Sequence, residues 1–327
     1  MSGMAFERVL ITGIAGHVGA NLARACLRNG LEVHGLVRST TDLWRLQDSS
    51  LAVRLHSVDL TCYDSVCRIV EEVAPDVVFH CAAERRQEYP ATLMGNVLGT
   101  ANLLEATRPD SKLRFVHLAS SLEYGPSDRP LRETDRLQPT TRYGASKAGG
   151  TLLAQQAAHS GQRHIVVLRL FHVCGPWESP HRLVPTAIMA AHTGTELHLT
   201  TGDFRRDYIY VDDVVTACLR AAEAERIFGE AINIGTGVET SNEELVHHVE
   251  GVMGRQIPVN IGAYAPRETD TNHWVADIRK AEQLMGWHPT RSVLAGLTET
   301  RNWLEKHEQI YAGGRRHGLL SARDDRL

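Results

Sequence analysis

The sequence lacks the features that mark several large classes of protein. Its six cysteines are scattered, with none spaced as C-x-x-C, so we expect free thiols in a reducing compartment rather than disulfides. None of the seventeen histidines falls in an H-E-x-x-H pattern, and we predict no metal site. The chain shows neither a signal-peptide pattern nor an apolar run long enough to span a membrane, so a cytoplasmic location is expected.

A strong charge of either sign is also missing. The 35 lysines and arginines nearly balance the 39 acidic residues, and a net charge of −4 gives no electrostatic reason to expect nucleic acid or a membrane as a partner. What is present is an ordinary soluble composition, 43% hydrophobic and 23% charged, over 327 residues. That length suits one large domain or two smaller ones, and we expect an enzyme or a sensor.

Short strands and amphipathic helices alternate through the first half of the chain. Strands are predicted at 8–12, 31–37, 51–56, 76–81, 113–118 and 164–170, and helices at 18–28, 65–73, 91–107 and 143–159. This order predicts the α/β class, with a Rossmann doubly wound parallel sheet covered on both faces. We place this domain at 1–175, a smaller C-terminal α/β lobe at 176–310, from which some segments return to the first domain, and a disordered tail at 311–327.

The first predicted strand runs into a glycine-rich turn, R-V-L-I-T-G-I-A-G-H-V-G. Gly13 permits the tight turn, Gly16 lets the backbone approach a pyrophosphate, and Gly19 lets the helix pack closely on the strand. Unpaired N–H groups at the start of the helix then bind the anion. His17 and Val18, which lie between Gly16 and Gly19, join the three glycines as predicted dinucleotide-binding residues.

The end of the second predicted strand lacks the acid that NAD-binding sites usually place there to accept a hydrogen bond from the ribose 2′-OH. The sequence has Arg38 and Ser39 instead, and a guanidinium with a hydroxyl suits a 2′-phosphate. We therefore expect NADP, with NAD as the alternative. Asp59 and Leu60, which follow the third strand, are expected to flank the adenine.

Tyr143 and Lys147 lie four residues apart in R-Y-G-A-S-K, and hence on one face of a predicted helix. A phenol is a poor base at neutral pH, but a neighbouring ammonium and a positive nicotinamide ring stabilise the phenolate. The glycine loop and the two serines of A-S-S-L-E-Y-G, Ser120 and Ser121, lie upstream of this pair. Together these motifs indicate acid–base chemistry beside a nicotinamide.

With these motifs in place, the sequence resembles the extended short-chain dehydrogenase/reductases of the nucleotide-sugar epimerase/dehydratase group. The likeness runs from about Val9 to Leu304 and includes A-A-E after the fourth strand, N-V-L-G-T-A-N-L-L-E-A, Y-G-A-S-K, R-R-D-Y-I-Y-V-D-D-V and L-M-G-W-H-P. The resemblance implies that the Rossmann domain holds NAD(P) and the C-terminal lobe a nucleoside-diphosphate sugar. It also implies a homodimer formed through the helices near 91–107 and 143–159.

The resemblance assigns roles to individual residues. Tyr143 would be the acid/base, Lys147 would contact the nicotinamide ribose, and Ser120 would hydrogen-bond the reacting oxygen. The other positions it marks are Ala82 and Asn96 for the cofactor, and Ser121, His172, Arg206 and Arg267 for the substrate, where the two arginines would clamp the diphosphate. His172 replaces the family's usual Asn, and either donates to the substrate or packs within its loop; the short loop at 85–89 likewise leaves the sugar open.

The residues before Tyr124 bear on the reaction. A 4,6-dehydratase of this family has T-D-E or T-S-E there, whereas this chain has Ser-Ser-Leu at 120–122, with Glu123 displaced by one. A shift of one residue along an extended strand turns a side chain to the other face, so Glu123 is expected to miss the site. We therefore expect NADPH-dependent reduction of a 4-keto-(6-deoxy)hexose, with a 4-epimerase as the alternative; a dehydratase and a non-catalytic NADP sensor are less favoured.

Overall fold

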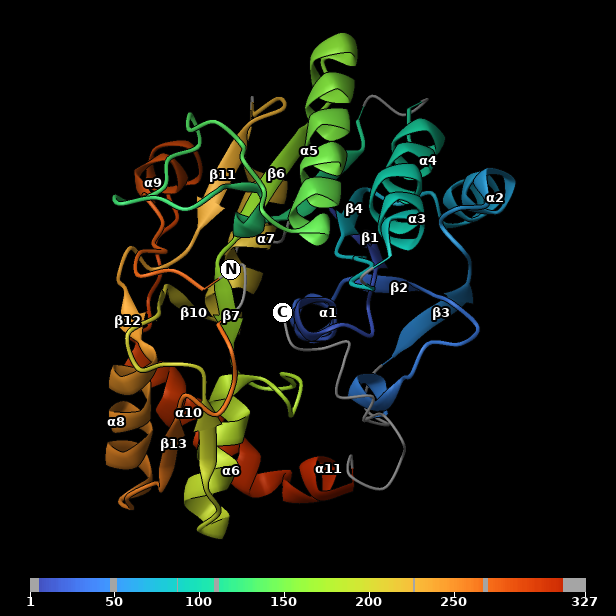
Figure 1. The fold of residues 1–327 in the computed structure, drawn as a ribbon. Coiled ribbons are helices and arrows are strands. Elements are labelled where there is room, and N and C mark those ends of the chain that lie inside the picture. Colours follow the sequence, from blue (N-terminus) through green and yellow to red (C-terminus); the bar gives the residue numbers. More distant parts are fainter. Residues whose placement is uncertain are drawn as a thin grey trace.

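The computed structural model describes residues 6–47, 52–86, 88–108, 112–225, 227–266 and 270–313. Within these ranges the larger body is built on a seven-stranded parallel sheet with the order β11-β6-β5-β4-β1-β2-β3 (Figure 1). The strands are β1 (Arg8–Thr12), β2 (Glu32–Val37), β3 (Val53–Ser57), β4 (Val77–His80), β5 (Arg114–Ser120), β6 (Ile165–Leu170) and β11 (Ala231–Ile234). The predicted α/β class and Rossmann sheet are confirmed.

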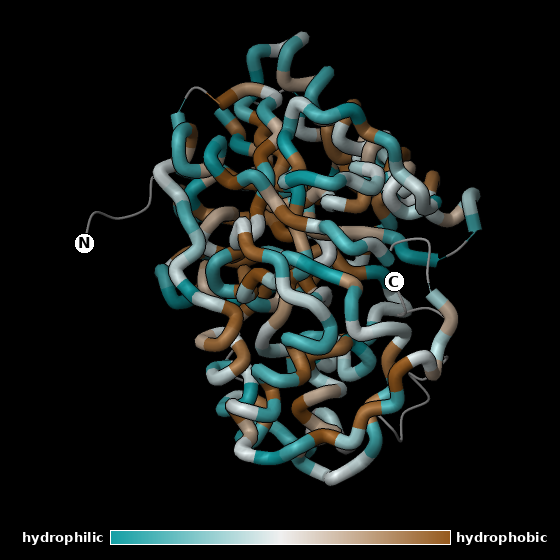
Figure 2. The backbone as a smooth tube through the Cα atoms, turned by 60° about the vertical axis from the view of Figure 1, so that its left-hand side comes forward, coloured by the Kyte–Doolittle hydropathy of each residue, from teal (hydrophilic) through white to brown (hydrophobic). Residues whose placement is uncertain are grey.

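Helices cover both faces of this sheet because its strands are apolar on both sides. Along β1, Val9 and Ile11 pack into the core on one face and Leu10 into the core on the other. The first face is covered by α1 (His17–Arg28), α7 (Val211–Glu223) and α9 (Arg279–Met285), and the second by α2 (Tyr63–Val73), α4 (Gly99–Ala106) and α5 (Arg142–Gly161). Figure 2 shows the resulting concentration of hydrophobic chain inside the body.

The chain returns to the sheet after the predicted domain boundary at residue 175. β11 pairs with β6 in parallel, and α7 packs on the same face as α1. The segment 176–310 is therefore shared between the two bodies rather than forming one continuous lobe.

The smaller lobe lies below the sheet in Figure 1 and has its own apolar core. Its helices are α6 (Leu183–Thr193), α8 (Asn242–Met253) and α10 (Val293–Lys306), joined by the strand pairs β7 (His172–Cys174) with β10 (Tyr208–Tyr210), β8 (Leu197–Leu199) with β13 (Val259–Ile261), and β9 (Arg205–Arg206) with β12 (Thr240–Ser241). A last helix, α11 (Glu308–Gly313), extends past the predicted start of the tail at 311. The rest of that tail, from 314 on, lies outside the described residues.

The predicted helix at 91–107 is confirmed as one continuous helical segment, 89–106, which contains a π-helical turn. α3 (Tyr89–Thr92) leads into a π-helical turn, η2 (Leu93–Leu98), and only then into α4. Short 3-10 turns, η1 (Trp44–Leu46) and η3 (Ser121–Glu123), complete the larger body. None of the helices in the described ranges combines the length and apolar character needed to cross a membrane.

Candidate active site

A cavity of about 1140 Å³ opens where the smaller lobe meets the carboxyl ends of the parallel strands. Its walls include the glycine loop, the segments that follow β2 and β4, the end of β5, and parts of the smaller lobe. β1 lies between β4 and β2, so the chain order reverses at this point of the sheet. Ligands of open α/β sheets bind in the crevice at such a switch point.

Two positions of the glycine loop require glycine because the backbone packs closely around them. A Cβ on Gly13 would lie 2.6 Å from the Ala82 backbone, and one on Gly19 would lie 2.4 Å from the Gly13 carbonyl oxygen. Gly16 is the N-cap of α1 and supplies no side chain to cap it. The start of α1 therefore presents N–H groups and a partial positive charge toward the cavity, which fits a pyrophosphate.

His17, in the first turn of α1, adds an unsatisfied polar atom to this wall. Burial and the nearby Arg45 and Arg182 lower the pKa of His17 to about 3, so the ring is neutral. Its Nε2 is buried and has no hydrogen-bond partner among the described residues. A bound polar group would satisfy it.

The predicted adenosine residues reach the cavity with one exception. Arg38, Asp59 and Leu60 line it, as do His17, Val18 and Ala82. Ser39 does not lie on the wall, where Thr40 and Thr41 take its place. The Arg38 guanidinium is 3.1 Å from the carboxylate of Glu84, a residue for which no role was predicted.

Asn96 lies behind the wall rather than on it. Its side chain is almost fully buried, and its amide donates to the Glu84 carbonyl oxygen at 2.8 Å and to Ser146 Oγ at 2.8 Å. Its own oxygen accepts from the Glu84 N–H at 2.6 Å. Asn96 thus holds the loop after β4 in position, and the π-helical turn η2 carries the residue that does so.

Ser120 and Tyr143 line the same part of the cavity, from the end of β5 and the first turn of α5. Thr141 caps α5 by accepting from the Gly144 N–H, which fixes the turn that carries Tyr143. The Arg85 guanidinium lies over the Tyr143 ring, 5.4 Å from its centroid. This cation comes from the short loop that the sequence marked as unusual.

Lys147 follows Tyr143 by one turn of α5 and is buried behind the cavity wall. Burial, reinforced by the charge of Lys147, lowers the pKa of His80 to about 3 and that of His117 well below its ordinary value. Both imidazoles are therefore neutral beside the ammonium.

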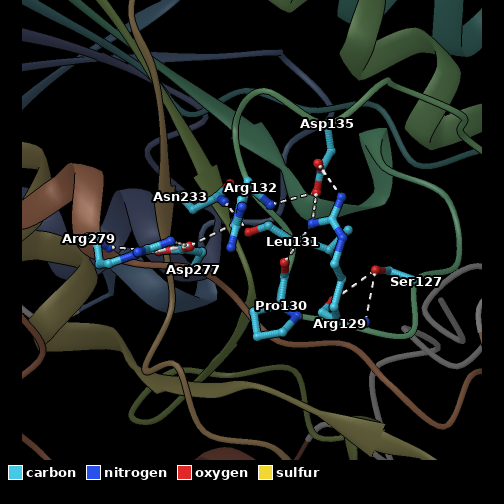
Figure 3. A network of polar contacts seen from close by, with 9 residues as sticks. All are labelled: Ser127, Arg129, Pro130, Leu131, Arg132, Asp135, Asn233, Asp277 and Arg279. Atoms are coloured by element: carbon cyan, nitrogen blue, oxygen red, sulfur yellow. Dashed lines mark hydrogen bonds and ion pairs between the residues drawn. The ribbon is translucent and has the colours of Figure 1, made fainter.

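Ser121 is held by a residue that sequence reasoning missed. Trp274 Nε1 donates to Ser121 Oγ at 3.0 Å, and both residues line the cavity. The segment that carries Trp274 is braced by the polar network of Figure 3, in which Asn233 donates to the Leu131 carbonyl oxygen at 2.9 Å and Arg132 pairs with Asp277 at 3.3 Å. The Trp274 indole thus fixes the Ser121 side chain, although the two residues are 153 positions apart in the sequence.

Leu122 lines the cavity and Glu123 does not, as predicted. The reason differs from the predicted one, because residues 121–123 form the 3-10 turn η3 and do not continue the strand. The Glu123 side chain is fully buried and accepts hydrogen bonds from Arg169 Nε at 2.9 Å, Thr151 Oγ1 at 2.9 Å and the Ser120 N–H at 3.2 Å. These hydrogen bonds occupy the Glu123 carboxylate and stabilise the turn η3.

The smaller lobe brings Arg206 and His172 to the cavity. Arg206 pairs with Asp270 at 2.9 Å, and His172 Nε2 lies 3.0 Å from an Arg182 nitrogen. Arg267, the second predicted diphosphate clamp, lies outside the described residues.

Glu178 is a further cavity residue that the sequence did not indicate. Burial raises its pKa to about 7, against the opposing charge of Arg182, and one carboxylate oxygen has no hydrogen-bond partner among the described residues. No group of three or more metal-ligating side chains occurs in the part of the chain that the structure describes.

A Rossmann sheet whose cavity combines a glycine cradle with Ser120, Tyr143 and a buried Lys147 defines a short-chain dehydrogenase/reductase enzyme. Residues 9–235 match the model of the NAD dependent epimerase/dehydratase family, and the chain belongs to that family.

Relatives with known names carry out different reactions. The UDP-glucose 4-epimerase of Mycolicibacterium smegmatis is 30% identical over 92% of this chain and 100% of that protein. The dTDP-glucose 4,6-dehydratase of Salmonella typhimurium is 28% identical over 90% of this chain and 92% of that protein. A Bacillus cereus UDP-glucuronic acid 4-epimerase, solved with UDP-glucuronic acid and NAD, superimposes with a TM-score of 0.81 at 26% identity, over 92% and 99% of the two chains.

Proposed function

We propose that this protein is an NADP-dependent oxidoreductase that acts at C4 of a nucleoside-diphosphate sugar, and that it reduces a 4-keto-(6-deoxy)hexose. The observation that carries the proposal is the set of side chains that line the cavity around Tyr143. Ser120 and Tyr143 are both there, and the side chain beside them is the apolar Leu122. The wall therefore has the groups for carbonyl chemistry but not the acid that an elimination of water would need at that place.

Each of these residues would have a separate role in the reduction. When bound, NADPH supplies the hydride. Tyr143 donates its phenolic proton to the carbonyl oxygen, and the Ser120 hydroxyl donates a hydrogen bond to the same oxygen. The buried charge of Lys147 then stabilises the phenolate that Tyr143 becomes. Arg206, which lines the cavity, and Arg267 would clamp the diphosphate, and His172 would donate to a phosphate or a sugar hydroxyl.

Two observations favour NADP. No acid stands at the end of β2, and the Arg38 guanidinium lines the cavity there. NAD is the alternative, supported by its presence in the solved Bacillus cereus relative.

A 4-epimerase is the second candidate function. It needs the same Ser120, Tyr143 and Lys147, and the Mycolicibacterium smegmatis relative carries that name. Purified protein should first be denatured and the released nucleotide identified. NADPH oxidation should then be followed with a panel of 4-keto nucleotide sugars. Tightly held NAD, with interconversion of C4 epimers and no net oxidation, would favour the epimerase.

Tyr143→Phe tests the assignment of the acid. It should lower kcat by about 100-fold or more, because general acid catalysis contributes about that factor. Tyr63→Phe, on the exposed side of α2, is the matched control and should leave kcat unchanged. Near-normal turnover in Tyr143→Phe would show that another group delivers the proton.

We also propose that the protein is a homodimer. Large apolar side chains are exposed on neighbouring helices of the larger body: Tyr89 on α3, Leu93 on η2, and Leu152 on α5. A second copy of this face would cover them.

A further inference from the structure

The cavity end that follows β2 carries two opposed charges in contact. The Arg38 guanidinium and the Glu84 carboxylate lie 3.1 Å apart, and both residues line the cavity. They come from the loops after β2 and β4, the strands on either side of β1. A ligand atom within reach of one is therefore close to the other.

Glu84 is held firmly, whereas Arg38 is not. The Glu84 side chain is 10% exposed and that of Arg38 is 56% exposed. Both backbone groups of Glu84 are bonded to Asn96, at 2.6 and 2.8 Å, independently of the carboxylate. Burial opposes ionisation, but hydrogen bonds and charge from Arg86, with the bond from Arg38, lower the pKa of Glu84, so it is a carboxylate at neutral pH.

The Arg38 guanidinium and the Glu84 carboxylate favour different groups at the 2′ position of the ribose. A guanidinium binds a 2′-phosphate, which a carboxylate repels. A carboxylate accepts a hydrogen bond from a 2′-hydroxyl, which is the role that the missing acid at the end of β2 would have had. Glu84 Oε1 accepts from the Arg85 and Arg86 N–H groups, and Oε2 accepts from the Arg38 and Arg86 guanidiniums, so a 2′-hydroxyl would bind in place of one of these two exposed guanidiniums. The neighbouring acids accept hydrogen bonds as well, Asp42 from the Trp44 N–H and Asp59 from Thr61.

We propose that Glu84 is a second determinant of cofactor choice, which supplies the ribose-hydroxyl acceptor that β2 lacks and limits the preference for a 2′-phosphate introduced by Arg38. The inference rests on the proposed nicotinamide-cofactor binding. On this inference the site binds both NADP and NAD, and Arg38 and Glu84 together set the preference between them.

The test is the ratio of the two dissociation constants, Kd for NAD⁺ over Kd for NADP⁺, measured by titration of the full-length protein. Glu84→Gln should raise this ratio about tenfold, because it removes both the charged acceptor and the repulsion. Arg38→Gln should move the ratio in the opposite direction. Asp42→Asn removes a carboxylate from the same end of the cavity and should change the ratio by less than about threefold.

The same variants should be titrated with 2′,5′-ADP and 5′-AMP, which isolate the 2′-phosphate from the nicotinamide, and their melting temperatures compared. A ratio that stays constant or falls in Glu84→Gln, in protein that melts as the wild type does, overturns this inference and leaves the proposed function standing. If Glu84→Gln does not fold, Glu84→Ala takes its place, and a ratio that fails to rise in that variant overturns the inference. Wild-type protein that binds neither dinucleotide overturns both proposals.

Discussion

Glu123→Ala should destabilise the protein strongly, although Glu123 does not touch the cavity. Its carboxylate forms an ion pair with Arg169 at 2.9 Å, and the two side chains are 0% and 3% exposed. Removing one member of such a pair leaves the other charge buried without its counter-ion. The expected loss in free energy of unfolding is about 3–5 kcal/mol.

The remaining contacts of Arg169 do not make up for this loss. The Nη1 of Arg169 donates to the Tyr124 hydroxyl at 2.9 Å. That hydroxyl is neutral and itself donates to Asn233. Burial and the neighbouring Arg169 act in opposite directions on Tyr124, and the net result raises the pKa of the phenol to about 12, so it does not become an anion. Glu123→Gln keeps the shape of the side chain and should cost less than Glu123→Ala.

Urea unfolding followed by tryptophan fluorescence measures the effect. Glu105→Ala is the matched control, because its partner Arg108 and the acid itself are 70% and 54% exposed, and it should change stability by less than about 0.5 kcal/mol. The double variant Glu123→Ala/Arg169→Met should lose less than the two single variants added together, since no buried charge is left behind. A Glu123→Ala protein as stable as the control, or strict additivity in the double variant, would refute the reasoning.

Two further predictions concern pH and assembly. The pKa of Glu178 is raised from 4.5 to about 7 by burial, so the folded protein holds this proton more tightly than the unfolded chain does, and its contribution to stability is lost as pH rises from about 4.5 to 7. Glu178→Gln should therefore gain stability relative to wild type between pH 5 and 8, by up to about 3 kcal/mol in urea unfolding; parallel pH profiles would contradict this. Leu152→Glu, on the exposed face of α5, should turn a dimer into a monomer in sedimentation velocity, whereas Leu284→Glu on α9 should not; a monomeric wild type would contradict the proposed homodimer.

The parts of the fold that follow from local patterns were predictable. The alternation of apolar strands and amphipathic helices gave the parallel sheet, and the glycine spacing located the turn after β1. The helix predicted at 91–107 is present, but its π-helical turn, which carries the polar contacts of Asn96, was not predicted because no apolar period signals it. The short strands β12 and β13 are likewise too brief to show a period of two.

The candidate site likewise contains residues that local patterns predict and residues that they do not. Ser120, Tyr143 and Arg38 were found because each stands in a motif or at a strand end. Trp274 and Glu84 act through contacts with partners 153 and 46 residues away in sequence, and such contacts leave no local pattern. One signal for Glu84 was available: it follows β4, which neighbours β1 on the side opposite β2, so the ends of β2 and β4 approach the same ligand.

The pair formed by Arg38 and Glu84 also bears on which reaction the site performs. A reductase consumes one reduced cofactor in every turnover, so its site must release the oxidised form and admit a new molecule each time. An epimerase returns the hydride to the same sugar and can keep its cofactor bound. Arg38 and Arg86, the two guanidiniums on Glu84, are 56% and 55% exposed, although the Glu84 side chain is 10% exposed. The exposure of Arg38 leaves the proposed 2′-phosphate contact open to solvent, which suits a cofactor that enters and leaves in every turnover, as the proposed reduction requires.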